Sequence, residues 1–186
     1  MISDYFTRSG RSFKDTQIPV LKGDGLRQTD PARLERSAGI KVVLDNLRSV
    51  FNVGSIFRTS ECLALGELVL CGTTPTPEHP NMSKTAMGTC ERVSWRHTER
   101  TVDAILELKE KGYRIYALET AEAAVSVMTF KPDHPFALVL GNESLGISPT
   151  VLSLCDMCLA LPVMGWKNSL NVGVAFAIAS YQLVFA

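Results

Sequence analysis

Three segments of the chain combine polar side chains with glycines at places where chemistry could occur. In the first, Asn52 stands where a helix N-cap is wanted, and Gly54 lets a ligand or another chain come close to the backbone. Arg58 follows one to two turns into the expected helix and points about 140° away from its apolar stripe. Arg58 therefore faces solvent, a ligand or a partner chain, although the segment also fits an ordinary cap followed by a solvated arginine.

The second segment, residues 141–147, is a tight turn bracketed by Gly141 and Gly146, with Glu143 as its only acid. This carboxylate could accept hydrogen bonds from a hydroxyl, an amine or Arg58, or it could be solvated. The segment lacks the order GxxxxGK(S/T) of a phosphate-binding loop, and the chain has no G-x-G-x-x-G after a strand. A nucleoside triphosphate, nicotinamide or flavin site therefore has little support.

The third segment, residues 162–173, holds Ser169 as a possible N-cap of the last helix. A serine nucleophile needs a neighbouring base and an acid that orients it, and the three histidines of the chain form no such pattern. Residues 170–186 are apolar, but polar residues interrupt them and they are shorter than the roughly 20 residues of a membrane span. The sequence therefore predicts a buried final helix and no membrane segment.

Two further patterns admit a functional and a structural interpretation. Cys155 and Cys158 have the C-x-x-C spacing of metal and redox sites, yet zinc needs about four ligands and no second close pair exists. Plain packing is the favoured interpretation, and no metal is expected. Arg92, Arg96 and Arg100 recur every four residues, which fits a phosphate-binding stripe or, slightly better, a solvated charged segment.

The charge balance limits how the protein can bind nucleic acid. The 186-residue chain has 19 basic and 19 acidic residues, so its formal net charge is zero. A protein that binds RNA by bulk charge is strongly basic, so any RNA contact must use local patches or a second copy of the chain. Five cysteines, an odd number, and a polar N-terminus without a signal peptide predict a reduced, cytoplasmic protein.

Apolar runs and helical spacing predict an α/β fold with a mainly parallel sheet flanked by helices. Strands are expected at residues 40–44, 67–71, 114–118, 136–140 and 157–161. Helices are expected at residues 53–64 and 101–111, from Pro149 after its cap Ser148, and from residue 168 or 169 to residue 185. Ligands bind outside the carboxyl ends of such strands, and all three polar segments follow strands directly.

The chain divides into an N-terminal extension, residues 1–38, and one domain, residues 39–186. The extension has few core residues and an expected short helix at residues 31–37, and it fits a loose surface tail or an RNA-contacting arm. The final helix is apolar nearly all round, so it must be covered on more than one side. The sheet covers one side, and we expect a second copy of the chain to cover the other in a homodimer.

The three segments, taken together and in this order, resemble the three motifs of the SpoU/TrmH branch of the SPOUT class of RNA methyltransferases. The likeness covers residues 40–186, and the third motif is the most specific. The matching stretches are Asn52-x-Gly54-x-x-x-Arg58-Thr59, Leu140-Gly141-Asn142-Glu143-x-x-Gly146 and Leu161-Pro162-x-x-Gly165-x-x-x-Ser169-Leu170-Asn171-Val172.

The resemblance implies a deep C-terminal trefoil knot, a homodimer, and S-adenosyl-L-methionine held by backbone groups and apolar side chains of the knotted loops. The cofactor-binding positions that it implies are Val139, Leu140, Gly141, Leu161, Val163, Met164, Ser169 and Leu170. The catalytic position that it implies is Arg58, supported by Asn52, Glu143, Ser169 and Asn171. The implied activity is methylation of a ribose 2′-hydroxyl in tRNA or rRNA, with an active site that can draw residues from both chains.

Two other functions are alternatives. A non-catalytic RNA-binding or assembly factor could keep the same fold, but the intact set of Arg58, Glu143 and residues 169–171 favours an enzyme. An unrelated nucleotide-binding α/β enzyme is disfavoured because the phosphate-binding loop is absent.

Overall fold

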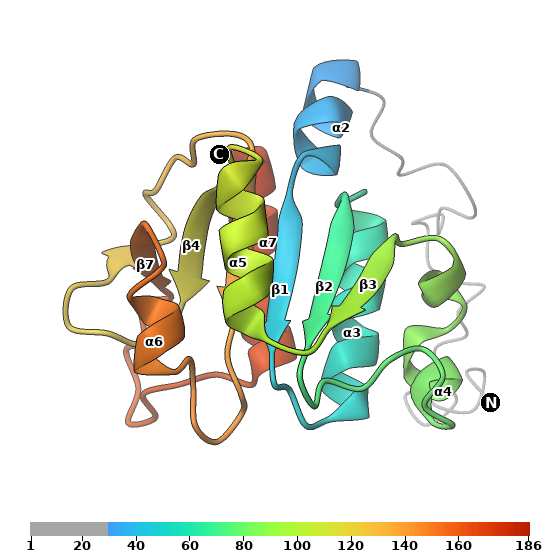
Figure 1. Ribbon diagram of the computed structural model, residues 1–186. Helices are drawn as coiled ribbons and strands as arrows, with labels where there is room; N and C mark the ends of the chain where they lie inside the picture. The colour runs from blue at the N-terminus through green and yellow to red at the C-terminus, as the bar shows by residue number, and fades with distance from the viewer. Residues whose placement is uncertain (1–29) are drawn as a thin grey trace, which may run out of the picture. The chain divides into compact units, whose positions relative to one another are not determined.

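The computed structural model describes residues 30–186 and shows, within them, one parallel sheet of seven strands. The strands are β1 (Lys41–Asp45), β2 (Glu67–Cys71), β3 (Trp95–Thr98), β4 (Arg114–Leu118), β5 (Val125–Ser126), β6 (Phe136–Leu140) and β7 (Met157–Ala160). Their order across the sheet is β3-β2-β1-β6-β4-β7-β5, and every neighbouring pair is parallel. The carboxyl ends of β1 to β4 therefore lie at one edge, the lower edge in Figure 1.

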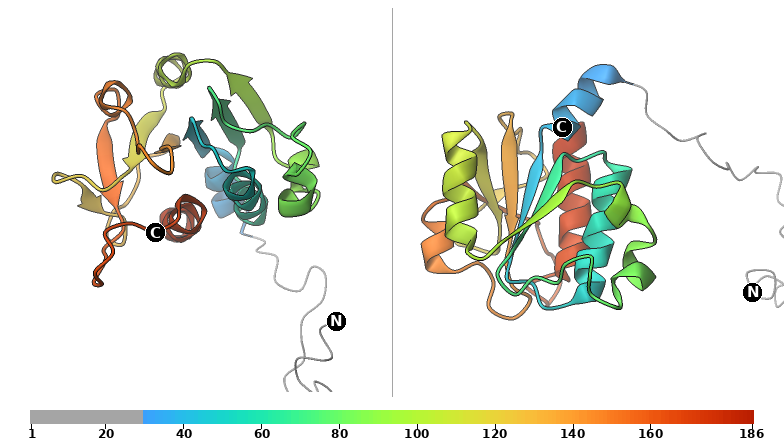
Figure 2. Two further views of the ribbon diagram at one scale, coloured as in Figure 1. Left: turned by 90° about the horizontal axis from the view of Figure 1, so that it is seen from below. Right: turned by 45° about the vertical axis from the view of Figure 1, so that its right-hand side comes forward.

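Helices cover both faces of this sheet. The helical elements are α2 (Pro31–Ala38), α3 (Val50–Cys62), α4 (Met82–Ala86), the 3-10 turn η4 (Thr89–Glu91), α5 (Thr101–Glu110), α6 (Pro149–Leu152) and α7 (Val172–Phe185). Seen from below in Figure 2, α5 and α6 lie over one face of the sheet, and α3 and α7 lie side by side over the other. This three-layer arrangement confirms the predicted α/β class.

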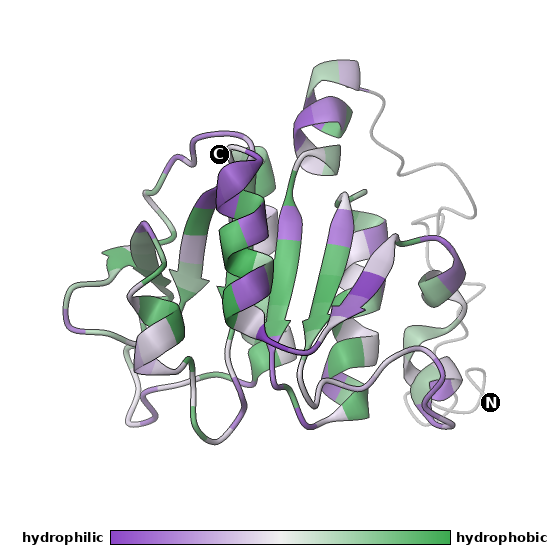
Figure 3. Ribbon diagram, in the orientation of Figure 1, coloured by the Kyte–Doolittle hydropathy of each residue, from purple (hydrophilic) through white to green (hydrophobic). Residues whose placement is uncertain are grey.

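Alternation along the strands divides the apolar side chains into two cores. Leu138 of β6 packs in the core under α7 with Phe176, whereas its neighbour Val139 packs in the opposite core with Ile105 of α5. Every residue of β6 is buried, as a central strand covered on both faces requires. Figure 3 shows β1 and β2, on the other side of β6 from β4, as mostly apolar strands.

The five predicted strands are confirmed to within one residue, but four other elements, β3, β5, α4 and η4, were not predicted. The prediction was wrong for β3, because its residues Arg96, His97 and Thr98 are polar and were assigned to a charged segment. This polarity is tolerated because β3 is an edge strand with a single neighbour, β2. The short elements α4 and β5 were also missed.

The predicted starts of two helices were wrong. Helix α3 begins at Val50 because Ser49 caps it, with Ser49 Oγ accepting a hydrogen bond from the backbone N–H of Asn52. Asn52 is therefore inside the first turn and not at the N-cap. Helix α7 begins at Val172 with Asn171 as its cap, so Ser169 lies in the preceding loop and not at the helix start. Because Ser49 and Asn171 cap the two helices, the side chains of Asn52 and Ser169 are available for other contacts.

The arginines at positions 92, 96 and 100 do not form a single stripe. Arg96 lies on β3 and makes ion pairs with Glu67 at 3.6 Å and Glu107 at 3.0 Å. Arg100 pairs with Asp103 at 3.8 Å in the first turn of α5. These contacts favour the structural interpretation of the segment over phosphate binding.

Helix α2 spans residues 31–38, close to the predicted 31–37, and packs on the domain. The hydroxyl of its buried Ser37 donates to the carbonyl of Leu63, and the guanidinium of Arg33 lies 4.7 Å from the ring centroid of Phe185. The remainder of the predicted extension, residues 1–29, lies outside the described residues. No helix within residues 30–186 has the length and apolar character needed to cross a bilayer.

Candidate active site

A cavity of about 580 Å³ opens at the carboxyl ends of β4, β6 and β7. Its wall is built from four stretches of chain that are far apart in sequence. These stretches are residues 118–120, 140–147, 160–163 without Pro162, and 168–175 without Gly173 and Val174. In Figure 1 the loops that follow β6 and β7 lie below the sheet, at the edge where parallel sheets bind ligands.

Glu143 holds the second segment against the first. Its carboxylate accepts hydrogen bonds from the backbone N–H groups of Arg48 at 2.9 Å and Ser49 at 3.0 Å, and from Nδ2 of Asn52 at 2.9 Å. Partial burial raises the pKa of Glu143, but these three hydrogen bonds outweigh it and hold the pKa below its usual value. Glu143 is therefore a carboxylate at neutral pH.

Asn52 in turn joins the first segment to the third. Nδ2 of Asn171 donates to Oδ1 of Asn52 at 3.0 Å, so the two asparagines and Glu143 form one connected chain of hydrogen bonds. Oδ1 of Asn171 also accepts from the backbone N–H groups of Gly173 and Val174, which caps α7. The structure thus brings together Asn52, Glu143 and Asn171, which the sequence singled out from three separate segments.

The turn at residues 141–147 is fixed by its own backbone. Gly146 has a φ of +67°, a conformation that side-chain-bearing residues rarely adopt. A Cβ at Gly141 would lie 2.4 Å from the carbonyl carbon of Gly146 and 2.5 Å from the nitrogen of Ile147, so only glycine fits there. Oε2 of Glu119 accepts from the backbone N–H of Ile147 at 3.0 Å and ties the turn to the end of β4.

The charged side chains of the cavity wall are all acidic. Among the described residues that line it, Glu119 and Glu143 are carboxylates, and no lysine, arginine or histidine is present. Leucine, isoleucine, valine and alanine side chains form much of the remaining surface. Such a wall suits a ligand that carries positive charge next to apolar surface, and it disfavours a phosphate inside the cavity.

Arg58 lies on the exposed side of α3 and is not part of this wall. Within residues 30–186 it makes no hydrogen bond or ion pair, and Glu143 does not bind it, although the sequence allowed that contact. One turn before it, Ser55 borders the start of α7: its Oγ lies 3.5 Å from a Cβ built on Gly173. The guanidinium is therefore available to a group outside the cavity of its own chain.

Six of the eight positions implied for the cofactor lie in the cavity wall, namely Leu140, Gly141, Leu161, Val163, Ser169 and Leu170. Val139 does not, because strand alternation turns it into the core beneath α5. Met164 does not either, because its side chain is fully exposed. Glu119 lines the cavity but was not predicted as a site residue. It directly follows a predicted strand, and ligands of parallel sheets bind outside the carboxyl ends of strands, so its position alone could have identified it.

The C-x-x-C pair shows no sign of a metal or redox site. Within the described residues, no group of three or more histidine, cysteine or acidic side chains could hold a metal ion. Burial raises the pKa of the Cys155 thiol to about 11, and it also raises the pKa of Cys158. Their thiols donate to two separate carbonyls, those of Val151 and Glu119, which agrees with a packing role.

Comparison with known proteins matches residues 39–181 to the SpoU rRNA Methylase family. The chain is 30% identical over 156 residues to a tRNA (guanosine(18)-2′-O)-methyltransferase from Thermus thermophilus, covering 84% of this chain and 79% of that protein. It is also 30% identical over 142 residues to a TrmH family tRNA/rRNA methyltransferase from Staphylococcus haemolyticus, covering 76% of this chain but only 57% of the relative's length.

Solved structures agree with the sequence match. An AdoMet-bound rRNA methyltransferase from Sinorhizobium meliloti superposes with a TM-score of 0.72 at 25% identity, covering 77% of this chain and 54% of that one. The family match spans the sheet, the cavity and the residues that join its three segments. The chain therefore belongs to the SpoU rRNA Methylase family.

Proposed function

We propose that this protein is an S-adenosylmethionine-dependent methyltransferase that modifies a ribose 2′-hydroxyl of tRNA or rRNA in the cytoplasm. The observation that carries the proposal is the hydrogen-bonded chain Glu143–Asn52–Asn171, which joins the three polar segments beside one cavity. The activity named for the Thermus thermophilus relative supports the same chemistry.

The cavity fits S-adenosylmethionine in size and in charge. Its volume of about 580 Å³ is in the range of small-molecule sites, and its two carboxylates complement a ligand with a sulfonium and an ammonium group. Leu140, Gly141, Leu161, Val163, Ser169 and Leu170 would hold it. When bound, this cofactor supplies an electrophilic methyl group. Val139 and Met164 would not contact the cofactor, because neither residue lines the cavity.

Arg58 is the proposed catalytic residue. A neutral 2′-hydroxyl is a poor nucleophile, and a guanidinium with a pKa above about 12 is a poor base. Arg58 therefore stabilises the developing alkoxide and binds an adjacent phosphate, and the proton leaves through that phosphate or through water. Holding the hydroxyl in line with the methyl group lowers the activation barrier, and such positioning can contribute up to about 7–11 kcal/mol.

The supporting residues act by position. Glu143 binds the backbone at the start of α3, so it orients the helix that carries Arg58 and does not touch the guanidinium. Asn52 and Asn171 lock the same helix to α7. Ser169 lies in the cavity wall and is proposed to hydrogen-bond the ligand there.

We also propose that the working unit is a homodimer formed through α7. Val174, Ile178, Tyr181 and Phe185 form an exposed apolar stripe along that helix. Exposed apolar surface of this extent is typical of an interface. A dimer would place a second chain next to α3, and Arg58 would then serve the cavity of the partner, which agrees with its position outside its own cavity.

The trefoil knot implied by the family resemblance is a proposal as well. After β7 the chain runs along residues 161–171, past the ends of β4 and β6, before it enters α7 beside α3. In Figure 1 this segment passes below the sheet together with the 141–148 loop. The match to the SpoU rRNA Methylase family supports this proposal.

Purified protein, labelled S-adenosylmethionine and total RNA test the proposal directly. Digestion and mass spectrometry should identify a 2′-O-methylated nucleoside, whereas a methylated base would contradict the chemistry. Calorimetry should detect binding of S-adenosylmethionine, and RNA binding without it would favour the non-catalytic factor. Arg58→Ala should abolish turnover and retain cofactor binding, and a wild-type rate in that variant would remove Arg58 from its role.

A further inference from the structure

We propose that Trp166 is a stacking platform for an unpaired nucleobase of the RNA substrate, set on the rim of the cavity. This inference rests on the proposed function, because it concerns how the same site holds its RNA. Trp166 is 92% exposed, although it is the largest apolar side chain of its loop. Burying an aromatic side chain of this size is strongly favourable, so its exposure calls for a binding partner.

The loop around Trp166 places the indole at the cavity. Val163 on one side of it in the chain, and Asn168 and Ser169 on the other, all line the cavity wall. Gly165 precedes the indole, and a Cβ there would meet no atom within 4 Å, so the space around the loop is open. The ring therefore projects from the rim into solvent and not into the wall.

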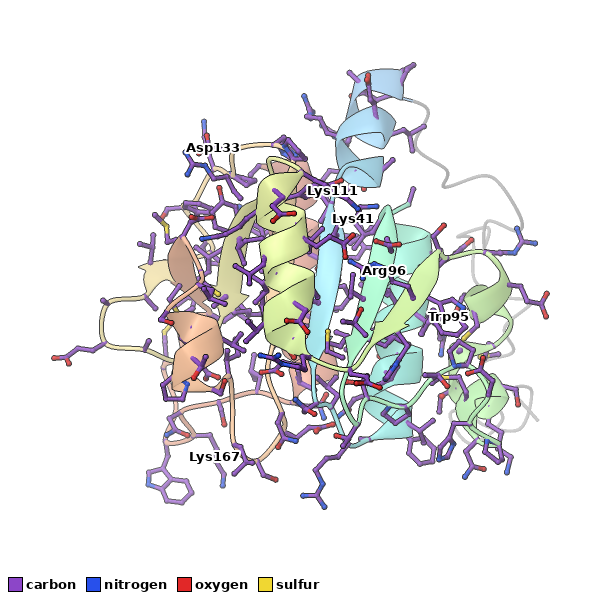
Figure 4. The ribbon with its side chains drawn as sticks, in the orientation of Figure 1. Lys41, Trp95, Arg96, Lys111, Asp133 and Lys167 are labelled. Atoms are coloured by element: carbon purple, nitrogen blue, oxygen red, sulfur yellow. The ribbon has the colours of Figure 1, made fainter. Side chains whose placement is uncertain are left out.

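A positive charge accompanies the ring. Nζ of Lys167 lies 4.9 Å from the centroid of the Trp166 ring, in a cation–π contact. Figure 4 shows Lys167 below the sheet, at the level of the loops. An aromatic face for a base, together with a cation for the neighbouring phosphate, is the combination that binds single-stranded nucleic acid.

The charge of the cavity determines which part of the RNA can enter it. Its wall has two carboxylates and no cation among the described residues, so phosphates are repelled from the interior and drawn to Lys167 at the rim. A ribose that reaches the cavity cannot keep its base stacked in a duplex, and unstacking that base costs a few kcal/mol. An indole at the rim offers a new stacking partner that offsets this cost.

The chain contains two tryptophans, which makes a fluorescence test possible. Trp95 is partly buried against the core, so Trp95→Phe leaves Trp166 as the only reporter. A mixed-sequence 12-nucleotide single-stranded RNA should quench this fluorescence, and a duplex of equal phosphate concentration should quench it far less. Equal quenching by both RNAs, or none by the single strand, would overturn the proposal.

The same reporter distinguishes RNA from a second copy of the chain. If the partner chain covers Trp166, its emission should shift to shorter wavelength as protein concentration rises in the absence of RNA, and stacking on RNA would be excluded. Emission that stays at the wavelength of exposed indole up to the concentration at which the protein is fully associated supports an RNA contact.

Substitutions give the second readout. Trp166→Ala should weaken the affinity for the single-stranded RNA about tenfold, while Trp166→Phe should retain most of it. Leu106→Ala, which removes an exposed apolar side chain from α5, is the matched control. Calorimetry should give the same S-adenosylmethionine affinity for Trp166→Ala as for wild type. If wild type methylates RNA but Trp166→Ala binds RNA equally well, the platform is refuted and the enzyme stands. If wild type binds no cofactor, the proposed function itself fails.

Discussion

Replacing Glu143 with glutamine removes the negative charge from the hydrogen bonds that join the three polar segments. It also puts an NH₂ donor where one carboxylate oxygen accepts a hydrogen bond. One carboxylate oxygen accepts from Arg48, and the other accepts from both Ser49 and Asn52. Glutamine has a single acceptor oxygen. In its better orientation that oxygen still accepts the hydrogen bonds from Ser49 and Asn52. The amide NH₂ then faces the backbone N–H of Arg48, and two donors cannot form a hydrogen bond.

The cost follows from these contacts. One hydrogen bond to a charged acceptor is lost, worth about 1.5–3 kcal/mol when buried, and the two that remain lose their charge assistance. Glu143 is largely exposed, so water replaces part of the missing contact. We expect Glu143→Gln to lower the free energy of unfolding by about 2 kcal/mol, which is a fall in Tm of roughly 4–8 °C for a domain of this size.

The effect should depend on pH with a definite sign. The pKa of Glu143 is lowered in the folded protein, so its stabilisation is complete above the ordinary value of 4.5 and is lost as pH falls through the folded pKa. Urea denaturation of both proteins should therefore show a gap at pH 7 that closes in more acidic solution.

Glu122→Gln is the matched control for this change. Glu122 is an exposed glutamate that makes no hydrogen bond or ion pair within the described residues, so its replacement should leave stability unchanged. An equal loss in both variants, or a gap for Glu143→Gln that persists undiminished well below pH 4, would refute the reasoning.

Three further changes test the fold and the proposed dimer. Gly141→Ala should lower the free energy of unfolding, measured by urea denaturation, by about 3 kcal/mol because its Cβ would meet the backbone of the same turn. Gly165→Ala adds a Cβ in open space and should leave that free energy almost unchanged, so equal losses in the two variants would contradict the reasoning. Gly54→Ala should lower the free energy of unfolding by about 2 kcal/mol because its Cβ would lie 2.1 Å from Oγ1 of Thr85, and the same change should cost less when made in a Thr85→Gly protein if that clash is the main cause. Tyr181→Arg should convert the dimer to a monomer in analytical ultracentrifugation, and a wild-type protein that sediments as a monomer would exclude the α7 interface.

Continuous apolar runs made most of the sheet predictable. β2, β4 and β6 have the predicted ranges because strands covered on both faces need apolar residues along their length. β3 could not be found in this way, since an edge strand can present polar side chains such as those of Arg96 and His97. The two-residue strand β5 carries too little pattern to be detected by alternation.

Local sequence could not decide where α3 and α7 begin. Ser49 and Asn52 are both good N-cap residues, and so are Ser169 and Asn171. The choice at α3 depends on Glu143, which draws the side chain of Asn52 away from its own helix. A contact between residues so far apart in sequence leaves no trace in local propensity.

The sequence motifs identified most residues of the site, but they could not show how those residues contact one another. Asn52, Glu143 and Asn171 were identified, yet their direct contact with one another and the separation of Glu143 from Arg58 depend on how the loops meet. Glu119 belongs to no motif, and only its place after β4 relates it to the cavity.

The position of β6 between β1 and β4 has a consequence for how the protein is made. When β1, β2 and β3 have left the ribosome, the free edge of β1 has no partner until β6 has been synthesised much later. An unpaired apolar strand edge is a template for aggregation, and distant strand pairing is slow. We therefore expect the nascent amino-terminal half to be the form of this protein that most needs a chaperone.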